Sequence, residues 1–104
     1  MGKINQSQAV IDVKPPKSLE EALVLIEEPQ GFVRLFKDLC TPGEWKSISD
    51  RWKVVQLVEQ RISYRKIYEM TGVSTATITR VSRALQEGEG YKALLDLVAK
   101  SKEQ

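Results

Sequence analysis

The chain has 104 residues, of which 41% are hydrophobic and 29% charged, with a formal net charge of +2, one cysteine and no histidine. This length and apolar fraction predict one folded domain and not a disordered chain. Because histidine is the commonest general base and metal ligand, and because the sequence contains no glycine-rich phosphate loop, we expect neither catalysis nor a metal site.

Two further features bear on where the chain resides. Its single cysteine, Cys40, cannot form an intrachain disulfide, which is typical of a reducing cytoplasm, and its place at the end of an apolar run predicts a buried thiol. No apolar run reaches the roughly 18 residues that a membrane helix needs, and no secretory signal precedes the first predicted helix. The sequence therefore predicts a cytoplasmic protein that does not contact a membrane.

Residues 1–17 are polar, lack helical periodicity and end in Lys14-Pro15-Pro16-Lys17. Because the two prolines favour extended backbone, we expect a flexible arm here. A weaker alternative is that Ala9-Val10-Ile11 docks on the rest of the chain. Residues 18–104 then form a single all-helical domain.

The first two helices of that domain are predicted from their end signals. Ser18 and Glu21 form a capping box that starts the first helix, and Pro29 predicts that it ends at Glu28, because a residue before proline avoids helical backbone. A second helix, from about residue 30 to residue 40, carries apolar side chains on more than one face.

A third helix, roughly residues 42–61, is predicted to be the longest. Thr41 and Glu44 form its capping box, with a proline at the first helical position. Arg51 falls in the middle of the helix's apolar sector, where an unpaired guanidinium is costly to bury. We expect either an ion pair, with Glu44 or with a partner chain, or a pocket that awaits an anionic effector. The apolar sector consists of Trp45, Ile48, Trp52, Val54, Val55 and Val58.

Residues 63–86 have the pattern of a helix-turn-helix. Ser63 is a good N-cap for a short helix that ends at Thr71, Gly72 supplies the positive φ of a tight turn, and Ser74 caps a second helix. The apolar residues fall where these two helices must touch each other and the rest of the domain, namely Ile67, Val73, Ile78, Val81 and Leu85.

The second of these helices has an outward face of Ala76, Thr79, Arg80 and Arg83. These side chains leave the helix slim enough for the major groove of DNA, where arginine can bind guanine, threonine a base or phosphate, and a methyl group the methyl of thymine. The free N–H groups at the helix start, beside Ser74 and Thr75, suit a phosphate. This face predicts binding of double-stranded DNA.

The charge distribution supports this prediction. Residues 61–83 contain five basic side chains and one acidic side chain, Glu69, so they carry +4 while the rest of the chain carries −2. Basic charge gathered on the one segment that fits a groove is what phosphate binding requires. The alternative is a packed helix pair with a solvated face, acting as a protein-interaction module that docks an acidic partner without touching DNA.

After a break at Glu87-Gly88-Glu89-Gly90, a last amphipathic helix is predicted from the spacing of Tyr91, Leu94, Leu95 and Val98, with two lysines at its end. About six helices and no convincing strand make the fold all-α. The first three have apolar surface too wide for burial in so small a chain, so we expect a homodimer to cover it. A two-fold dimer also sets two recognition helices about 34 Å apart, one turn of duplex.

Four segments together resemble the tryptophan-repressor superfamily: Leu39–Pro42, Asp50–Trp52, Ser63–Arg65 and Thr71–Arg80. The resemblance covers roughly residues 32–98 and is most specific for short members of unassigned effector that carry a Ser-Thr-Ala-Thr-Ile recognition helix. It implies an intertwined, all-helical dimer that binds operator DNA through the major groove. Family members repress transcription, some of them only when a small ligand positions the recognition helices.

The resemblance also implies individual DNA contacts. Arg65 sits where a family arginine reaches a guanine from the first helix of the motif, although a phosphate contact is equally open. Thr75, Ala76 and Thr79 sit where the recognition helix touches bases. Together with a phosphate contact by Lys66, the predicted DNA-binding residues are Arg65, Lys66, Ser74, Thr75, Ala76, Thr79, Arg80 and Arg83.

A candidate effector pocket is implied in the same way. Arg51 and Arg80 match two arginines that flank the indole in tryptophan-binding members, and Thr41 and Thr77 match residues that line the pocket. However, Val81 replaces the glycine that leaves room for the ring, and Ala84 replaces a serine that bonds the polar end of tryptophan. These two replacements indicate that tryptophan is not the corepressor, so any small-molecule effector is a different compound. No cofactor is expected.

Overall fold

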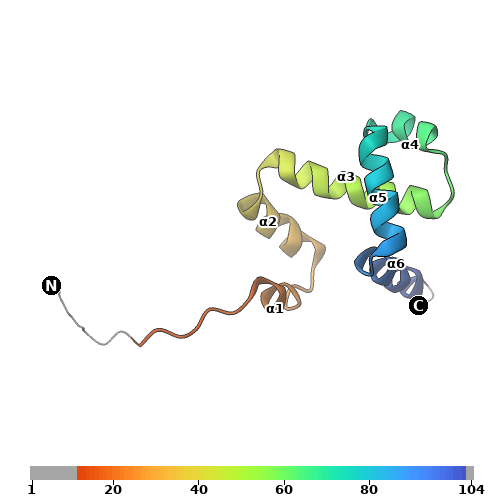
Figure 1. Cartoon of the computed structure of the whole chain (residues 1–104). Coiled ribbons are helices and arrows are strands. Elements are labelled where there is room, and N and C mark those ends of the chain that lie inside the picture. The colour runs from red at the N-terminus through yellow and green to blue at the C-terminus, as the bar shows by residue number, and fades with distance from the viewer. Residues whose placement is uncertain (1–11, 103–104) are drawn as a thin grey trace. The chain divides into compact units, whose positions relative to one another are not determined.

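The computed structural model describes residues 12–102 and shows six helices and no strand within them. The all-α prediction is confirmed. In chain order the helices are α1 (Leu19–Leu23), α2 (Pro29–Leu39), α3 (Pro42–Glu59), α4 (Tyr64–Thr71), α5 (Thr75–Glu87) and α6 (Gly90–Ser101) (Figure 1). None of these helices combines the length and apolar character that a bilayer crossing requires.

Residues 12–17 precede α1 without helical structure and are exposed. The rest of the predicted arm lies outside the described residues, and so does the segment Ala9-Val10-Ile11 for which docking was an alternative. The chain divides into two compact units with their boundary inside α2, after Leu35, and each unit is described by itself. The single domain over residues 18–104 stays a prediction.

In the first unit, the predicted capping box starts α1. The backbone N–H of Glu21 donates to Ser18 Oγ at 3.2 Å, and the backbone N–H of Ser18 donates to Glu21 Oε1 at 3.0 Å. These hydrogen bonds, first the backbone and then the side-chain donor of Ser18, lower the pKa of the Glu21 carboxyl.

The prediction that this first helix runs to Glu28 is wrong, because α1 ends at Leu23. Beyond it the backbone turns with i→i+3 hydrogen bonds, from Leu25 N to Ala22 O and from Ile26 N to Leu23 O, each 3.1 Å long. Val24 and Leu25 are 79% and 69% exposed, so little packing supports another helical turn at this point. Helices this short depend on packing, since propensity alone does not sustain them.

In the second unit, α3 begins at the predicted capping box, in which Thr41 N donates to Glu44 Oε1 at 2.8 Å and Glu44 N donates to Thr41 Oγ1 at 3.1 Å. The helix ends at Glu59 with a pair of hydrogen bonds typical of a Schellman motif, from Arg61 N to Val58 O (2.9 Å) and from Ile62 N to Leu57 O (3.2 Å). The left-handed position of this motif is held by Arg61, with φ 63°, where glycine is the usual residue.

The core of this unit lies where α5 packs on α3 and α4. Six apolar side chains are buried there: Val54 and Val55 of α3, Ile67 of α4, and Ile78, Val81 and Leu85 of α5. Half-buried side chains surround them, among them Trp52, Val73, Tyr91 and Leu95. At the other end of α3, Phe36 and Trp45 stack with ring centroids 5.1 Å apart.

Helix α5 is the element that joins the parts of this unit. It contacts α3 and α4 along its length and α6 beyond its end, as Figure 1 shows. The connection to α6 is short, and Lys92 Nζ donates to Gln86 O at 2.9 Å across it. The predicted break at Glu87–Gly90 and the last amphipathic helix are confirmed.

Candidate nucleic-acid interface

The turn between α4 and α5 is built from local hydrogen bonds. Ser63 Oγ accepts from Lys66 N at 3.2 Å and caps α4, and Gly72 closes it in a left-handed conformation with φ 76°. Gly72 N donates to Tyr68 O at 2.7 Å, and Val73 N donates to the hydroxyl of Thr71 at 3.1 Å. The predicted positive φ and both predicted N-caps of the motif are confirmed.

At the start of α5, the hydroxyl of Ser74 has two roles in the cap. It accepts from Thr77 N at 3.2 Å and donates to Thr77 Oγ1 at 3.1 Å. The N–H groups of Thr75 and Ala76, at the first two helical positions, have no acceptor within the helix. They are therefore available to an anion placed at this helix end.

Helix α5 is divided into a buried and an exposed face. Ile78, Val81, Ser82 and Leu85 are buried, and Ser82 is the one polar side chain among them. The burial of Ser82 was not predicted, although helical periodicity places it between Ile78 and Leu85. The four residues expected on the outward face, Ala76, Thr79, Arg80 and Arg83, are exposed, and so is Thr75 at the helix start.

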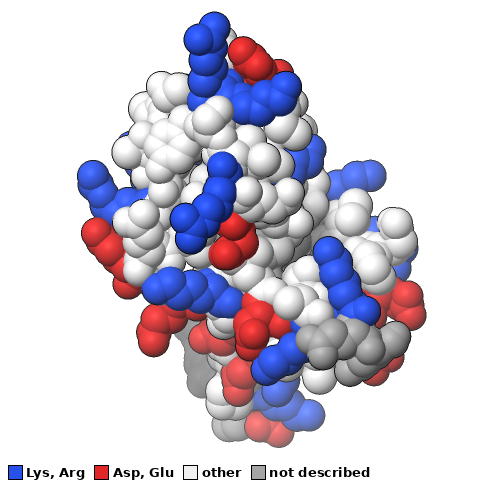
Figure 2. Space-filling view, turned by 90° about the vertical axis from the view of Figure 1, so that its right-hand side faces the viewer, with Lys and Arg blue, Asp and Glu red and all other residues white. Residues whose placement is uncertain are grey.

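Helix α4 adds two exposed cations beside this face, Arg65 and Lys66. In the space-filling view of Figure 2, basic side chains cover the top of the molecule, at the height of α4 in Figure 1, and an acidic group lies beside them. Arg65 pairs with Glu69, with Nε and Oε2 3.6 Å apart. Within residues 12–102, no ion pair involves Lys66, Arg80 or Arg83.

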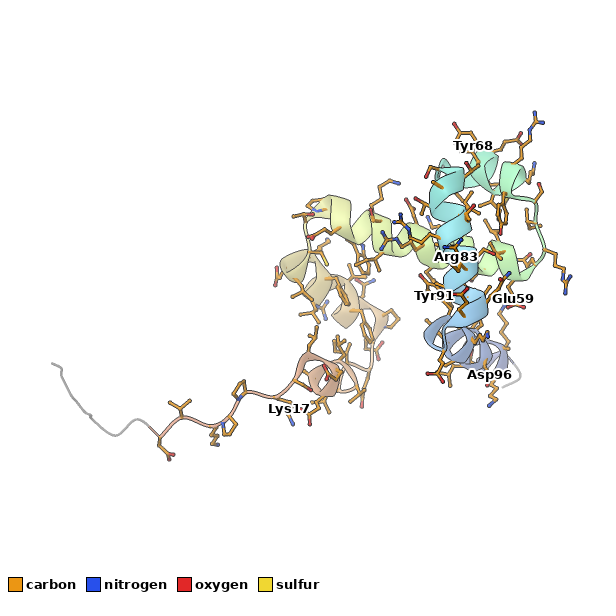
Figure 3. All side chains as sticks on the ribbon, viewed as in Figure 1. Lys17, Glu59, Tyr68, Arg83, Tyr91 and Asp96 are labelled. Atoms are coloured by element: carbon orange, nitrogen blue, oxygen red, sulfur yellow. The ribbon has the colours of Figure 1, made fainter. Side chains whose placement is uncertain are left out.

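Figure 3 shows Arg83 on α5, between the levels of Tyr68 on α4 and Tyr91 on α6. The exposed face of α5 therefore combines small and methyl-bearing side chains near its start with guanidinium groups further along that form no ion pair within residues 12–102. This surface can donate hydrogen bonds to phosphates and base edges.

The four residues of the candidate effector pocket are only partly brought together. Thr41 and Arg51 line one open groove of about 680 Å³, together with exposed Ser47 and half-buried Cys40. Half-buried Thr77 and exposed Arg80 are not among its lining residues.

The expectation that Arg51 is buried in an apolar sector is wrong for the single chain, in which Arg51 is exposed. The ion pair with Glu44, one of the alternatives for Arg51, does not form within the described residues, where the Glu44 carboxylate accepts the backbone N–H of Thr41. That hydrogen bond, followed by one from the Thr41 side chain, lowers the pKa of Glu44.

A second, apolar groove was not anticipated from the sequence. It has a volume of about 670 Å³ and lies between α3 and α6, where Trp45, Trp52, Tyr91 and Leu94 line it together with Arg51. The signal that could have found it is the spacing of Trp45 and Trp52, which puts two aromatic rings on one side of α3. In the part of the chain that the structure describes, no cluster of His, Cys, Asp or Glu side chains could hold a metal ion.

The capped α4, the left-handed glycine and the exposed face of α5 define a helix-turn-helix protein. Comparison with known sequences agrees: the family described as Trp repressor protein matches residues 16–99. The chain belongs to the Trp repressor family.

Individual relatives support the same assignment. The protein YerC of Bacillus subtilis (strain 168) is 36% identical over 92 residues, which is 85% of this chain and 88% of YerC. The Trp operon repressor homolog of Chlamydia caviae is 39% identical over 62 residues, 59% of this chain and 61% of that protein. A TrpR-like protein from Eubacterium eligens ATCC 27750 superposes with a TM-score of 0.74 at 34% identity, over 78% of this chain and 84% of that one.

The Trp repressor family is a family of DNA-binding regulators of transcription and not of enzymes. Membership therefore makes this chain a DNA-binding regulator.

Proposed function

We propose that the protein is a repressor that binds a two-fold symmetric operator as a homodimer, with α5 of each subunit in the major groove. The observation that carries the proposal is the exposed face of α5, which presents Thr75, Ala76 and Thr79 near its start. Arg80 and Arg83 follow on the same helix and form no ion pair with the described part of the chain. A major groove about 12 Å wide admits a helix with side chains of this size. Ser74 and the adjoining N–H groups suit a phosphate, and so does Lys66.

The roles of these residues are separable by mutation. Thr79→Ala should weaken binding to the cognate duplex by about 1–3 kcal/mol and leave random duplex nearly unchanged, because a base contact carries sequence information. Lys66→Ala should weaken binding to all sequences alike and lower the slope of log K against log salt by about 1, because a phosphate contact carries none. Both variants are measured by fluorescence anisotropy against a selected and a scrambled duplex. Equal losses on both duplexes in both variants would contradict reading of sequence by α5.

We propose that a second copy of the chain covers the exposed apolar surface of the second unit. Among residues 12–102 only six apolar side chains are buried, whereas Ile48, Leu94 and Leu97 are 45%, 45% and 62% exposed. The groove between α3 and α6 adds two tryptophans to this surface. Exposed apolar area of this kind marks an interface in soluble proteins.

The homodimer is tested by light scattering at micromolar concentration. We expect the mass of two chains for the wild type and of one chain for Leu97→Glu, which places a charge on the apolar surface of α6. Far-UV circular dichroism of the variant shows whether its helices are retained. A monomeric wild type would refute the dimer.

For the effector, we propose that the groove lined by Thr41 and Arg51 binds a small molecule other than free tryptophan. Arg51 is exposed there, and Val81, which stands where tryptophan-binding members have glycine, is 2% exposed and belongs to the core. Titration calorimetry with tryptophan should show no saturable heat. Since a regulator of transcription acts where the chromosome lies, we also propose a cytoplasmic location.

A further inference from the structure

Glu69 is an acidic side chain in the middle of a basic surface. Residues 61–83 contain five cations and this one carboxylate. It lies one helical turn after Arg65 on α4, and its Oε2 is 3.6 Å from Arg65 Nε. Both side chains face solvent, Arg65 with 90% and Glu69 with 53% exposure.

Stability does not explain this pair. Exposed i,i+4 ion pairs contribute little to folding, because water screens them and because two long side chains must be held in one geometry. A carboxylate on a surface that binds phosphate also repels the ligand. We therefore look for the role of Glu69 in DNA binding.

The position of the contact on the Arg65 guanidinium suggests this role. A guanidinium is a rigid plane with five N–H donors, and Glu69 approaches it at Nε. The recorded contact is to Nε and not to the two terminal nitrogens, which form the fork that binds guanine O6 and N7. The pair favours rotamers of the Arg65 side chain that keep Nε beside Glu69, so part of the conformational entropy is already lost before the fork meets a base.

The charge of Glu69 acts in the same direction. Binding to random DNA depends on neutralising phosphates, and a carboxylate beside Arg65 weakens that contribution for every sequence. A base edge carries acceptor atoms without a net charge, so it is repelled less. The pair therefore lowers affinity for random duplex more than for the cognate one.

We propose that Glu69 is a positioning residue that sets sequence specificity: it holds Arg65 at Nε with its fork directed to a base, and it disfavours contacts of Arg65 with phosphate. This inference rests on the proposed function. It goes further in assigning Arg65 to a base and in giving an acidic residue a role in discrimination.

The experiment compares wild type, Glu69→Gln and Asp96→Asn for binding to a selected cognate duplex and a scrambled duplex over a range of salt. Asp96→Asn is the matched control, because it removes one carboxylate from another exposed i,i+4 pair, with Lys100 at 3.1 Å. Figure 3 shows Asp96 on α6, at the far end of the second unit from Tyr68 on α4. Both variants change the net charge by the same amount.

For Glu69→Gln we expect random duplex to bind about threefold more tightly, with a salt slope steeper by about 0.9 per subunit, as for one additional phosphate contact. The cognate duplex should bind no more tightly, so that the ratio of the two affinities falls. Asp96→Asn should keep the ratio of the wild type. In an Arg65→Lys background, which lacks Nε and the fork, Glu69→Gln should no longer change the ratio.

Two results would overturn the inference alone. One is a wild type that discriminates between duplexes while Glu69→Gln tightens both by the same factor, which would be a charge effect without positioning. The other is a ratio in Glu69→Gln equal to that of Asp96→Asn. A wild type with equal affinity for every duplex would instead overturn the proposed function, and this inference with it.

Discussion

Replacing Gly72 by alanine tests the turn that sets α5 against α4. Gly72 has φ 76°, and a Cβ built on it meets no atom within 4 Å, so the cost of the methyl group is conformational and not steric. Left-handed backbone costs an L-residue roughly 1–2 kcal/mol. The smaller entropy of the unfolded alanine chain offsets about 0.4–1 kcal/mol of this. A net loss of about 1 kcal/mol is expected, which lowers Tm by about 4–8 °C in a domain of this size.

The assay is thermal and urea unfolding followed by far-UV circular dichroism, with Gly72→Asn as the matched variant. Asparagine tolerates left-handed backbone better than alanine, so it should lose clearly less stability. Since unfolding of a dimer depends on concentration, all three proteins are compared at one concentration. If Gly72→Ala unfolds at the wild-type midpoint, or if asparagine costs as much as alanine, the left-handed turn is not the source of the cost.

The remaining predictions concern the ends of α3. Arg61→Gly should raise the free energy of unfolding by up to about 1 kcal/mol in the same assay, because Arg61 has φ 63° at the position where glycine carries no strain; an unchanged midpoint would contradict this. The pKa of Glu44 is lowered from its ordinary value of 4.5, so its carboxylate contributes stability that is fully present above that value and is lost as pH falls through the lower folded-state pKa. Thr41→Ala removes the side-chain acceptor of the cap and should lower the free energy of unfolding by about 1 kcal/mol at neutral pH and by less in acid. Tm measured against pH for both proteins checks this. A difference in Tm between wild type and variant that is the same at every pH would show that Glu44 is not linked to the cap.

The parts of the fold that were predicted correctly from sequence are those with local causes. A Ser or Thr followed by Glu three residues later satisfies helix N–H groups whatever else surrounds it, so α1 and α3 start where Ser18 and Thr41 predict. Gly72 ends α4 for an equally local reason. The apolar spacing of Ile78, Val81 and Leu85 likewise marks the face that is buried.

The features that sequence could not predict depend on what packs against a residue. Pro29 limits how far α1 can extend, but α1 ends earlier, where exposed Val24 leaves it without packing. Arg51 lies within an apolar sector by periodicity, yet it is exposed because α3 is not covered there in the single chain. The burial of Ser82 is a different case, because helical periodicity does place it on the buried face and only its hydroxyl group suggests exposure.

In the candidate site, too, some features follow from local helical geometry and others depend on how distant segments pack. The outward face of α5 follows from helical geometry, and its residues are exposed as expected. The pair of Arg65 and Glu69 was missed, although their i,i+4 spacing is a known signal for helical ion pairs. Whether Thr41, Arg51, Thr77 and Arg80 form one pocket depends on elements that are far apart in the sequence, which spacing alone does not fix.

The most direct test of the account is selection of duplexes from a random pool by the full chain, repeated with Thr79→Ala. The account predicts one enriched, two-fold symmetric motif for the wild type, and a loss of preference at a matching position in each half-site for the variant. A wild-type pool without an enriched motif, or an identical motif from both proteins, would contradict the claim that the exposed side chains of α5 read base edges.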